Sequence, residues 1–272
     1  MWGMRDSSRR PIGIFDSGVG GLTVARSVRK VLPLEDIIYF GDTARVPYGN
    51  KSKETIDRFS REIVDFLIGK KVKAVVIACN TASSFSQSFL QRKYDIPIMG
   101  VISPGVRKAV SISKNNKIGI IGTEATVSSG AYEKELSKRY GKEFKMFSAS
   151  CPLFVPLVEN RMTSGEITTL AAEKYLTALK KNGIDTLILG CTHYPMLKKV
   201  ISNVMKGVHL VDSSEAVAEE VRNVLLLKGL ASRPPRGKGK MICYVSDAPG
   251  NFKKISGMFL KEEVDVKKVV LR

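Results

Sequence analysis

Short apolar runs alternate with amphipathic stretches along most of this chain. Runs such as Ile12 to Phe15, Ala74 to Ala78 and Asp185 to Leu189 are typical of buried strands, and helical patterns separate them. Strands that alternate with helices favour a mainly parallel sheet covered by those helices. With 272 residues, the chain is long enough for two modest domains. The sequence therefore predicts an α/β fold.

The second half of the alternating pattern repeats the first. Three pairs of motifs recur in the same order at nearly the same offset: Ile12-Gly13-Ile14-Phe15 with Ile118-Gly119-Ile120-Ile121, Val46-Pro47 with Val155-Pro156, and Cys79-Asn80-Thr81 with Cys191-Thr192-His193. We therefore expect two similar parallel-sheet domains related by pseudo-symmetry, with the active site in the cleft between them. Residues 1–103 and 213–272 are predicted to form the first domain, and residues 104–212 the second.

Two cysteines occupy matched positions in this repeat. Cys79 and Cys191 each follow a predicted strand and precede a helical pattern. Open α/β sheets bind ligands at this end of their strands, and a helix N-terminus favours thiolate over thiol. Two thiols on opposite sides of one carbon can remove a proton from one face and deliver one to the other. The pair predicts inversion of a stereocentre by two-base catalysis.

Polar residues near the two thiols are candidates for assisting groups. Asp16 ends the first strand, His193 can share a proton with Cys191, and Glu159 can orient His193. Each also has a structural interpretation: an N-cap for Asp16, a helix-start residue for His193 and a solvated carboxylate for Glu159. Hydroxyl and amide side chains suited to holding carboxylates surround both thiols: Ser17, Asn80, Thr81, Ser83, Thr123, Thr126 and Thr192.

The net charge of +18 attracts polyanions, but the basic residues are spread along the chain. The densest run, residues 233–240, lies in a Pro/Gly-rich connector, and no zinc finger or RNA-binding signature is present. Nucleic-acid binding is therefore expected only as a non-specific effect at low salt. No apolar run approaches the roughly 20 residues of a membrane span. The polar start, Met1 to Arg10, predicts a disordered tail and a cytoplasmic location.

The sequence predicts neither a metal nor a cofactor. Its four cysteines form no CxxC pair, only two histidines are present, and an intracellular chain is not expected to hold a disulfide. The run from Gly18 to Gly21 matches neither GxGxxG nor a P-loop, so a helix-entry turn is favoured over a phosphate site. No distinctive pyridoxal-phosphate site is apparent either.

Five motifs together resemble the glutamate racemases of the cofactor-independent aspartate/glutamate racemase superfamily. They cover nearly the whole chain in family order: Gly13 to Leu22, Gly41 to Gly49, Ala78 to Ser83, Ile121 to Thr123 and Gly190 to Pro195. The resemblance implies that Cys79 and Cys191 are the two bases, that Asp16 and His193 assist them, and that Glu159 lies behind His193. We expect the following residues to line the substrate pocket: Asp16, Ser17, Tyr48, Gly49, Asn80, Thr81, Thr123, Thr192 and His193.

The resemblance implies an enzyme that interconverts L- and D-glutamate and supplies D-glutamate for peptidoglycan, and we expect a homodimer. His193 favours glutamate, because the aspartate-specific relatives usually carry Glu there. Two alternatives stay open: a racemase for aspartate or another acidic amino acid, and a non-catalytic binding protein on the same fold. The paired cysteines argue against a binding protein, which has no need of two thiols.

Overall fold

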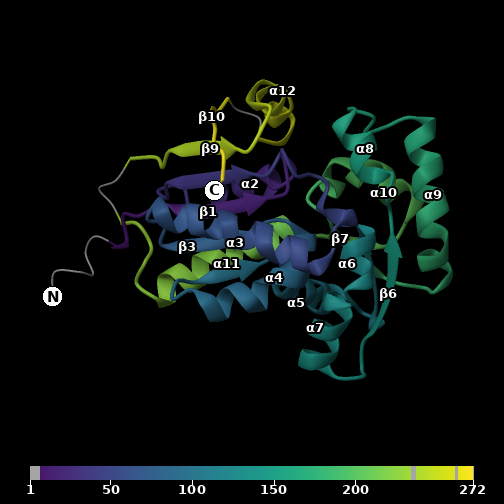
Figure 1. Ribbon diagram of the computed structural model, residues 1–272. Coiled ribbons are helices and arrows are strands. Elements are labelled where there is room, and N and C mark those ends of the chain that lie inside the picture. The colour runs from purple at the N-terminus through teal and green to yellow at the C-terminus, as the bar shows by residue number, and fades with distance from the viewer. Residues whose placement is uncertain (1–6, 234–236, 261–262, 272) are drawn as a thin grey trace.

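The computed structural model describes residues 7–233, 237–260 and 263–271, and its strands form two parallel sheets (Figure 1). The first sheet has the order β10-β9-β2-β1-β3-β4. Its strands are β1 (Ile12–Asp16), β2 (Ile37–Gly41), β3 (Ala74–Ile77), β4 (Ile98–Gly100), β9 (Met241–Val245) and β10 (Asp265–Lys268). The second sheet has the order β6-β5-β7-β8, with β5 (Lys117–Gly122), β6 (Lys145–Ser150), β7 (Thr186–Gly190) and β8 (His209–Asp212).

The two sheets share one strand order. The run β2-β1-β3-β4 corresponds to β6-β5-β7-β8, and every pairing within both runs is parallel. The predicted fold class, two similar parallel-sheet halves, is therefore confirmed. The first sheet uses strands from both ends of the chain, whereas the second uses residues 117–212 only. The predicted domain limits at 103/104 and 212/213 stay a prediction.

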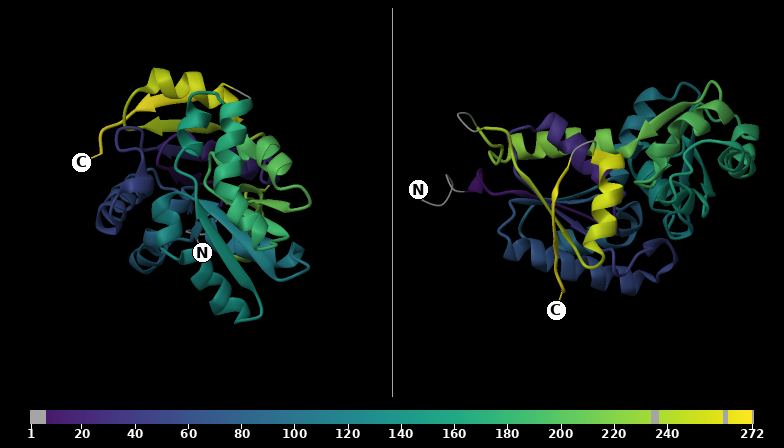
Figure 2. Two further views of the ribbon diagram at one scale, coloured as in Figure 1. Left: turned by 90° about the vertical axis from the view of Figure 1, so that its right-hand side faces the viewer. Right: turned by 90° about the horizontal axis from the view of Figure 1, so that it is seen from above.

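Helices cover both faces of the first sheet, as the right-hand view of Figure 2 shows. One face carries α2 (Leu22–Val31) and α11 (Ser213–Leu227), and the other carries α3 (Lys53–Gly69) and α4 (Asn80–Lys93). Side chains alternate across β1, so that Ile12 and Ile14 pack in the core with Leu22 on the first face, while Phe15 packs with Ile63 on the second. Burial of both faces explains the nearly continuous apolar strands.

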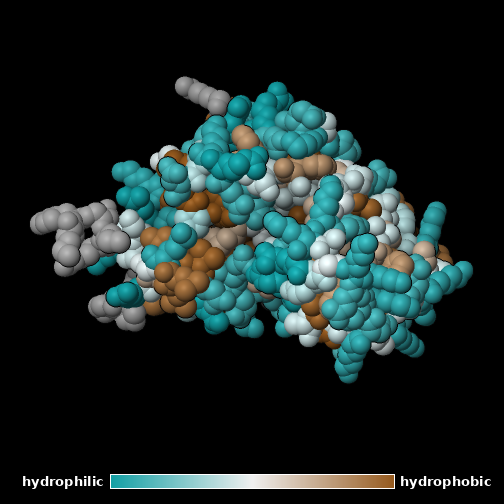
Figure 3. Space-filling view, turned by 90° about the horizontal axis from the view of Figure 1, so that it is seen from below, coloured by the Kyte–Doolittle hydropathy of each residue, from teal (hydrophilic) through white to brown (hydrophobic). Residues whose placement is uncertain are grey.

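The remaining helices surround the second sheet or join the two halves, except α12, which packs against α2 and β10 of the first half. They are α5 (Ile102–Ile112), α6 (Glu124–Ser128), α7 (Ala131–Tyr140), α8 (Phe154–Glu159), α9 (Glu166–Lys181), α10 (Lys198–Val204) and α12 (Pro249–Leu260), with short 3-10 turns η1 (Tyr48–Asn50) and η2 (Tyr194–Leu197). In the part of the chain that the structure describes, no helix combines the length and apolarity needed to cross a bilayer. Seen from below, hydrophilic side chains cover most of the surface (Figure 3).

The structure differs from the sequence pattern in three places. The pattern indicates no helix over residues 102–112, where α5 lies, and it indicates a turn over residues 155–158, which belong to α8; the two helices contain Pro104 and Pro156. Both prolines lie in the first helical turn, where a backbone N–H has no helical partner to lose. One helix predicted from about 126 to 140 is instead α6 and α7, separated at Gly130, whose φ is +61°.

The N-terminal tail is also more ordered than expected over its described part, residues 7–10. These residues lie in a turn closed by a hydrogen bond from Arg10 N to Ser7 O. The buried Lys73 ammonium donates to Ser8 O at 2.8 Å and pairs with Glu35. A buried charge needs such partners, so this pair ties the start of the first strand to the body of the protein. Residues 1–6 of the predicted tail lie outside the described part.

Candidate active site

Cys79 and Cys191 occupy equivalent places in the two halves. Cys79 follows β3 and is the N-cap of α4, where its sulfur accepts a hydrogen bond from Ala82 N at 3.5 Å. Cys191 follows β7, the strand that corresponds to β3, and precedes η2. Both residues are nearly buried, with 6% and 8% of their surface exposed. A negative charge on Cys191 raises the pKa of Cys79, so the two sulfurs lie in one electrostatic environment.

The Cys79 thiol is protonated in this environment. Burial and the nearby Asp16 carboxylate raise the pKa of Cys79 to about 12, although hydrogen bonds with Ala82 N and Ser17 act in the other direction. The Ala82 N–H at the helix N-terminus does lower the pKa of Cys79, as expected, but the loss of water on burial outweighs this one hydrogen bond.

Asp16 lies at the end of β1 and is fully buried. Its carboxylate accepts hydrogen bonds from Gly18 N at 2.9 Å and from the Thr192 hydroxyl at 3.4 Å. Burial raises the pKa of Asp16, and the charge of His193 together with these hydrogen bonds opposes that rise. The N-cap of α2 is Gly21, so Asp16 does not have the capping role considered for it.

His193 connects Cys191 to Glu159. Its Nδ1 is 3.9 Å from the Cys191 sulfur, and its Nε2 is 3.1 Å from Glu159 Oε1 at the end of α8. Burial disfavours the imidazolium, but the hydrogen bonds with Cys191 and Glu159 and the charge of Asp16 outweigh burial and raise the pKa of His193 to about 10. The side chain does not cap η2. A charged His193 can stabilise negative charge on Cys191 or return a proton to it.

We expect Glu159→Gln to lower the pKa of His193, because the substitution removes a hydrogen-bonded negative charge that favours the imidazolium. NMR titration of the imidazole resonances measures this directly. His209, exposed on β8, is the chain's other histidine, so only two sets of imidazole resonances have to be assigned. An unchanged His193 titration would show that the Glu159 contact is electrostatically unimportant.

The raised pKa of His193 also makes stability depend on pH. Because the folded pKa of about 10 exceeds the unfolded value of 6.5, the contribution of His193 is complete below pH 6.5 and is lost as pH rises toward 10. The wild-type protein should therefore lose more stability over this range than a Glu159→Gln variant does. Urea unfolding at a series of pH values measures the difference.

Hydroxyl groups from both halves meet beside the thiols. The Thr81 hydroxyl, at the start of α4, lies 3.0 Å from that of Thr123 and 3.1 Å from that of Thr126, and the last two lie 3.0 Å apart. Ser17 is 3.9 Å from the Cys79 sulfur. Gly49 lies so close to Thr123 that an added Cβ would come within 2.9 Å of the Thr123 Cβ.

Two predicted polar residues are already paired elsewhere. The Ser83 hydroxyl donates to Ile77 O at 3.0 Å, so it serves the β3–α4 connection. The Tyr48 hydroxyl is buried and donates to Asp42 in the loop that carries η1. The Tyr48 hydroxyl already has an acceptor. The predicted pocket role of Tyr48 therefore depends on where its side chain lies, next to the hydroxyl groups of Thr81, Thr123 and Thr126.

Sequence reasoning missed four residues that shape this site. The Tyr39 hydroxyl donates to Gly18 O at 2.7 Å, and the Tyr132 hydroxyl donates to Asn80 Oδ1 at 2.6 Å. The Phe259 ring on α12 packs against His193 with centroids 5.8 Å apart. Gly20 passes directly beside Thr192 and His193. The aromatic residues are spaced as core residues, so no local signal marks them, whereas the glycine run is visible in the sequence but indicates only a turn.

We expect Gly20→Ala to destabilise the protein by about 1–3 kcal/mol, as overpacking of a buried contact does. An added Cβ would lie 2.4 Å from the Thr192 hydroxyl and 2.5 Å from His193 Nδ1, and both groups are held by other contacts. Gly18→Ala is the matched control, since its Cβ would meet only Val46 at 3.6 Å. Equal unfolding free energies for the two variants would refute this steric argument.

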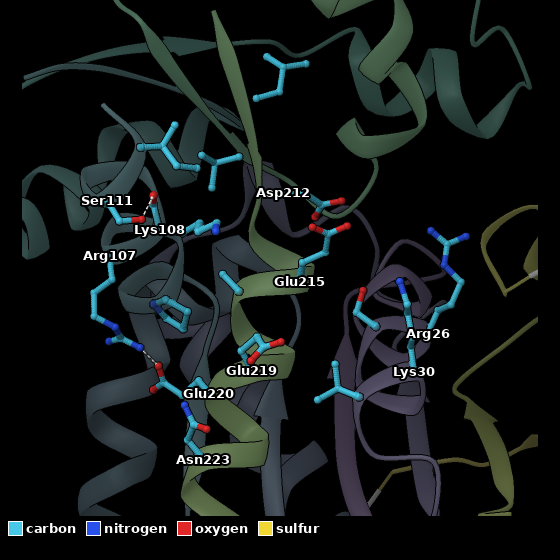
Figure 4. Close-up of a pocket in the computed structure, with 17 residues that line it drawn as sticks. Arg26, Lys30, Arg107, Lys108, Ser111, Asp212, Glu215, Glu219, Glu220 and Asn223 are labelled. Atoms are coloured by element: carbon cyan, nitrogen blue, oxygen red, sulfur yellow. Dashed lines mark hydrogen bonds and ion pairs between the residues drawn. The ribbon is translucent and has the colours of Figure 1, made fainter. Parts of the chain in front are cut away.

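A small cavity lies beside one of the two thiols. It is bordered by Asn80, Cys191 and Thr192 and has room for about one water molecule. A larger groove of about 950 Å³ lies between α2, α5 and α11 and contains neither Cys79 nor Cys191 (Figure 4). Among the described residues, no three His, Cys, Asp or Glu side chains gather as metal ligands would. We therefore place the candidate site at the thiols and not at the larger groove.

Comparison with known proteins agrees with this arrangement. Residues 22–221 match the Asp/Glu/Hydantoin racemase family. The chain is 48% identical to a glutamate racemase from Geobacter metallireducens over 92% of this chain and 93% of that protein. The structure superposes on the glutamate racemase of Bacillus anthracis with a TM-score of 0.93 and 39% identity, covering 97% and 98% of the two chains.

A second solved structure is a complex with an amino acid. It is the glutamate racemase of Francisella tularensis in complex with D-glutamate, which matches with a TM-score of 0.90 and 39% identity over 97% of this chain and 98% of that one. The family match spans more than half of the chain, and the sequence identity far exceeds what a shared fold alone requires. The chain belongs to the Asp/Glu/hydantoin racemase family and, within it, to the glutamate racemases.

Proposed function

We propose that this protein interconverts L- and D-glutamate by two-base catalysis without a cofactor, with Cys79 and Cys191 as the opposed acid–base pair. The observation that carries the proposal is the placement of the two thiols after the corresponding strands β3 and β7, in one electrostatic environment. The Francisella tularensis relative, whose structure is described as a complex with D-glutamate, supports glutamate as the substrate.

In the proposed reaction, the α-carbon of glutamate lies between the two sulfurs. A thiolate on one side removes the α-proton, and a thiol on the other side delivers a proton to the opposite face, so the configuration inverts and the protonation states of the two thiols exchange. By family resemblance, Cys191 takes the proton from L-glutamate and Cys79 takes it from D-glutamate. The resting proton on Cys79 suits the L-to-D direction, in which Cys79 is the donor.

The other groups assist this exchange. His193, supported by Glu159, stabilises charge on Cys191, and Asp16 supports Cys79 from the first half of the molecule. We assign the carboxylates and ammonium of glutamate to a pocket of polar side chains and backbone groups: Asp16, Ser17, Tyr48, Gly49, Asn80, Thr81, Thr123, Thr192 and His193. Donors held in place in a water-poor cleft stabilise the charge that develops on the substrate carboxylate.

The cellular role follows from the reaction. We infer that the protein acts in the cytoplasm, supplies D-glutamate for peptidoglycan and works as a homodimer. Sedimentation equilibrium of the full chain over a range of concentrations tests the dimer, and a constant monomer mass would reject it.

One assay tests the reaction. The protein is dialysed exhaustively, treated with EDTA and incubated in deuterium oxide with L-glutamate, D-glutamate or L-aspartate, while optical rotation and α-deuterium are followed. We expect both glutamate enantiomers to reach the same racemic mixture with deuterium at the α-carbon. Faster racemisation of aspartate would favour the alternative substrate. Absence of deuterium incorporation would favour a binding protein, and recovery only after addition of a divalent ion would reject the cofactor-free mechanism.

A further inference from the structure

Tyr132 reaches across the cleft to a proposed substrate-binding residue. It lies on α7, next to the second sheet, and its hydroxyl donates to Oδ1 of Asn80 at 2.6 Å, where Asn80 is the first residue of α4. Both side chains are buried, with 1% and 4% of their surface exposed. The proposed acid–base steps use no group on Tyr132, so this contact needs another explanation.

An asparagine amide has two chemically opposite ends. Its Nδ2 donates hydrogen bonds, whereas its Oδ1 only accepts them. A substrate carboxylate has only acceptors, so it binds favourably to Nδ2 and is repelled by Oδ1. The side chain can rotate to present either end, and its neighbours decide which end faces the cleft. Asn80 borders the small cavity beside Cys191 and Thr192, where the orientation of its amide matters for a ligand.

Tyr132 selects one of these orientations. Burial raises the pKa of the Tyr132 phenol, which therefore keeps its proton and remains a donor. Its ring is held in the apolar cluster that includes Val106 and Ile188, so it cannot easily turn away. Rotating the Asn80 amide would replace Oδ1 with Nδ2 beside the phenol, so the present hydrogen bond would be lost and the phenol would have to turn its proton to another acceptor.

We propose that Tyr132 is a positioning residue, which holds Asn80 Oδ1 so that the Nδ2 donors of Asn80 are presented to a carboxylate of the substrate. The inference rests on the proposed function, because it takes Asn80 as part of the glutamate pocket. Tyr132 and Asn80 come from different halves of the molecule. The amide is therefore oriented only when the halves are together.

The test is Tyr132→Phe, which removes one oxygen and keeps the ring. We expect the KM for both glutamate enantiomers to rise about tenfold, as for a weakened hydrogen bond to a charged group, while kcat changes less than about threefold. Tyr140→Phe is the control on the same helix, because the Tyr140 ring packs against Phe144. The KM of this variant should equal that of the wild type. An unchanged KM in Tyr132→Phe would overturn the proposal, even if the variant is less stable.

A double-mutant cycle separates positioning from a general effect on folding. If Tyr132 acts through Asn80, then Tyr132→Phe should change the KM less than about twofold in an Asn80→Ala background. The full tenfold effect in that background would overturn the proposal. Calorimetry with D-glutamate tests the positioning role independently of catalysis. If the protein binds glutamate but does not racemise it, the proposed reaction is rejected. The ratio of the Kd values of the wild type and Tyr132→Phe would still show whether Tyr132 positions Asn80.

Discussion

Replacing either Cys79 or Cys191 with alanine should abolish racemisation in both directions and leave the fold intact. Each proton transfer by a positioned group contributes about 10²–10⁴-fold to the rate, and inversion needs both thiols in every turnover. The loss should therefore reach or exceed the upper end of this range. The substitution removes one sulfur atom and, at Cys79, one weak capping contact with Ala82 N, so the fold should remain intact.

Deuterium exchange gives a sharper form of the same prediction. A variant that retains one thiol can still remove and return a proton on a single face. Cys79→Ala should therefore incorporate α-deuterium into L-glutamate without inverting it, and Cys191→Ala should do so with D-glutamate. Mass spectrometry of each recovered enantiomer measures this half-reaction. Exchange of the opposite enantiomer in each variant would reverse the assignment of the two faces.

The chain supplies two matched controls. Cys243 is fully buried within β9, and Cys151 follows β6 but is also fully buried, with its carbonyl accepting a hydrogen bond from the Tyr194 hydroxyl at 3.0 Å. Alanine at either position should keep turnover near that of the wild type, and its largest effect should be a loss of stability. If Cys79→Ala or Cys191→Ala behaves like these controls, the two-base assignment is wrong.

His193→Asn and Asp16→Asn should each lower turnover about 10²–10⁴-fold in both directions, because both groups set the charge around a thiol. His193 contacts the Cys191 sulfur and Glu159, whereas Asp16 acts on Cys79 and accepts the Thr192 hydroxyl. Equilibrium between enantiomers is fixed, so both directions must slow together. The two substitutions nevertheless weaken proton transfer on different faces of the substrate.

Primary isotope effects distinguish the two faces. With α-deuterated L- and D-glutamate, His193→Asn and Asp16→Asn should change the isotope effects unequally for the two enantiomers and in opposite senses between variants. Equal changes for both enantiomers in both variants would reject the side-specific roles while leaving the cysteine pair standing. Near-normal turnover in His193→Asn would reduce His193 to a structural residue at the start of η2.

Short-range pattern was sufficient for the main elements and for the thiol pair. Strands β1, β3 and β7 are apolar because both faces of each sheet are covered, and that pattern is visible in the sequence. The repeat of Cys79 and Cys191 placed both thiols after corresponding strands, as the sheet order confirms. Local pattern failed at α5 and α8, where a proline in the first turn resembles a break, and at Gly130, which divides α6 from α7.

The alternating strands and helices, the duplication and the paired cysteines thus follow from the sequence by itself, because each is recognised from short motifs that can be compared along the chain. The proton on Cys79, the charge on His193 and the orientation of Asn80 were decided by the tertiary structure alone. Each of these depends on burial and on partners far away in the chain, such as Asp16 beside Cys79, Glu159 beside His193 and Tyr132 beside Asn80. Desolvation and hydrogen bonding act through space, and only the assembled cleft brings these groups within reach of one another.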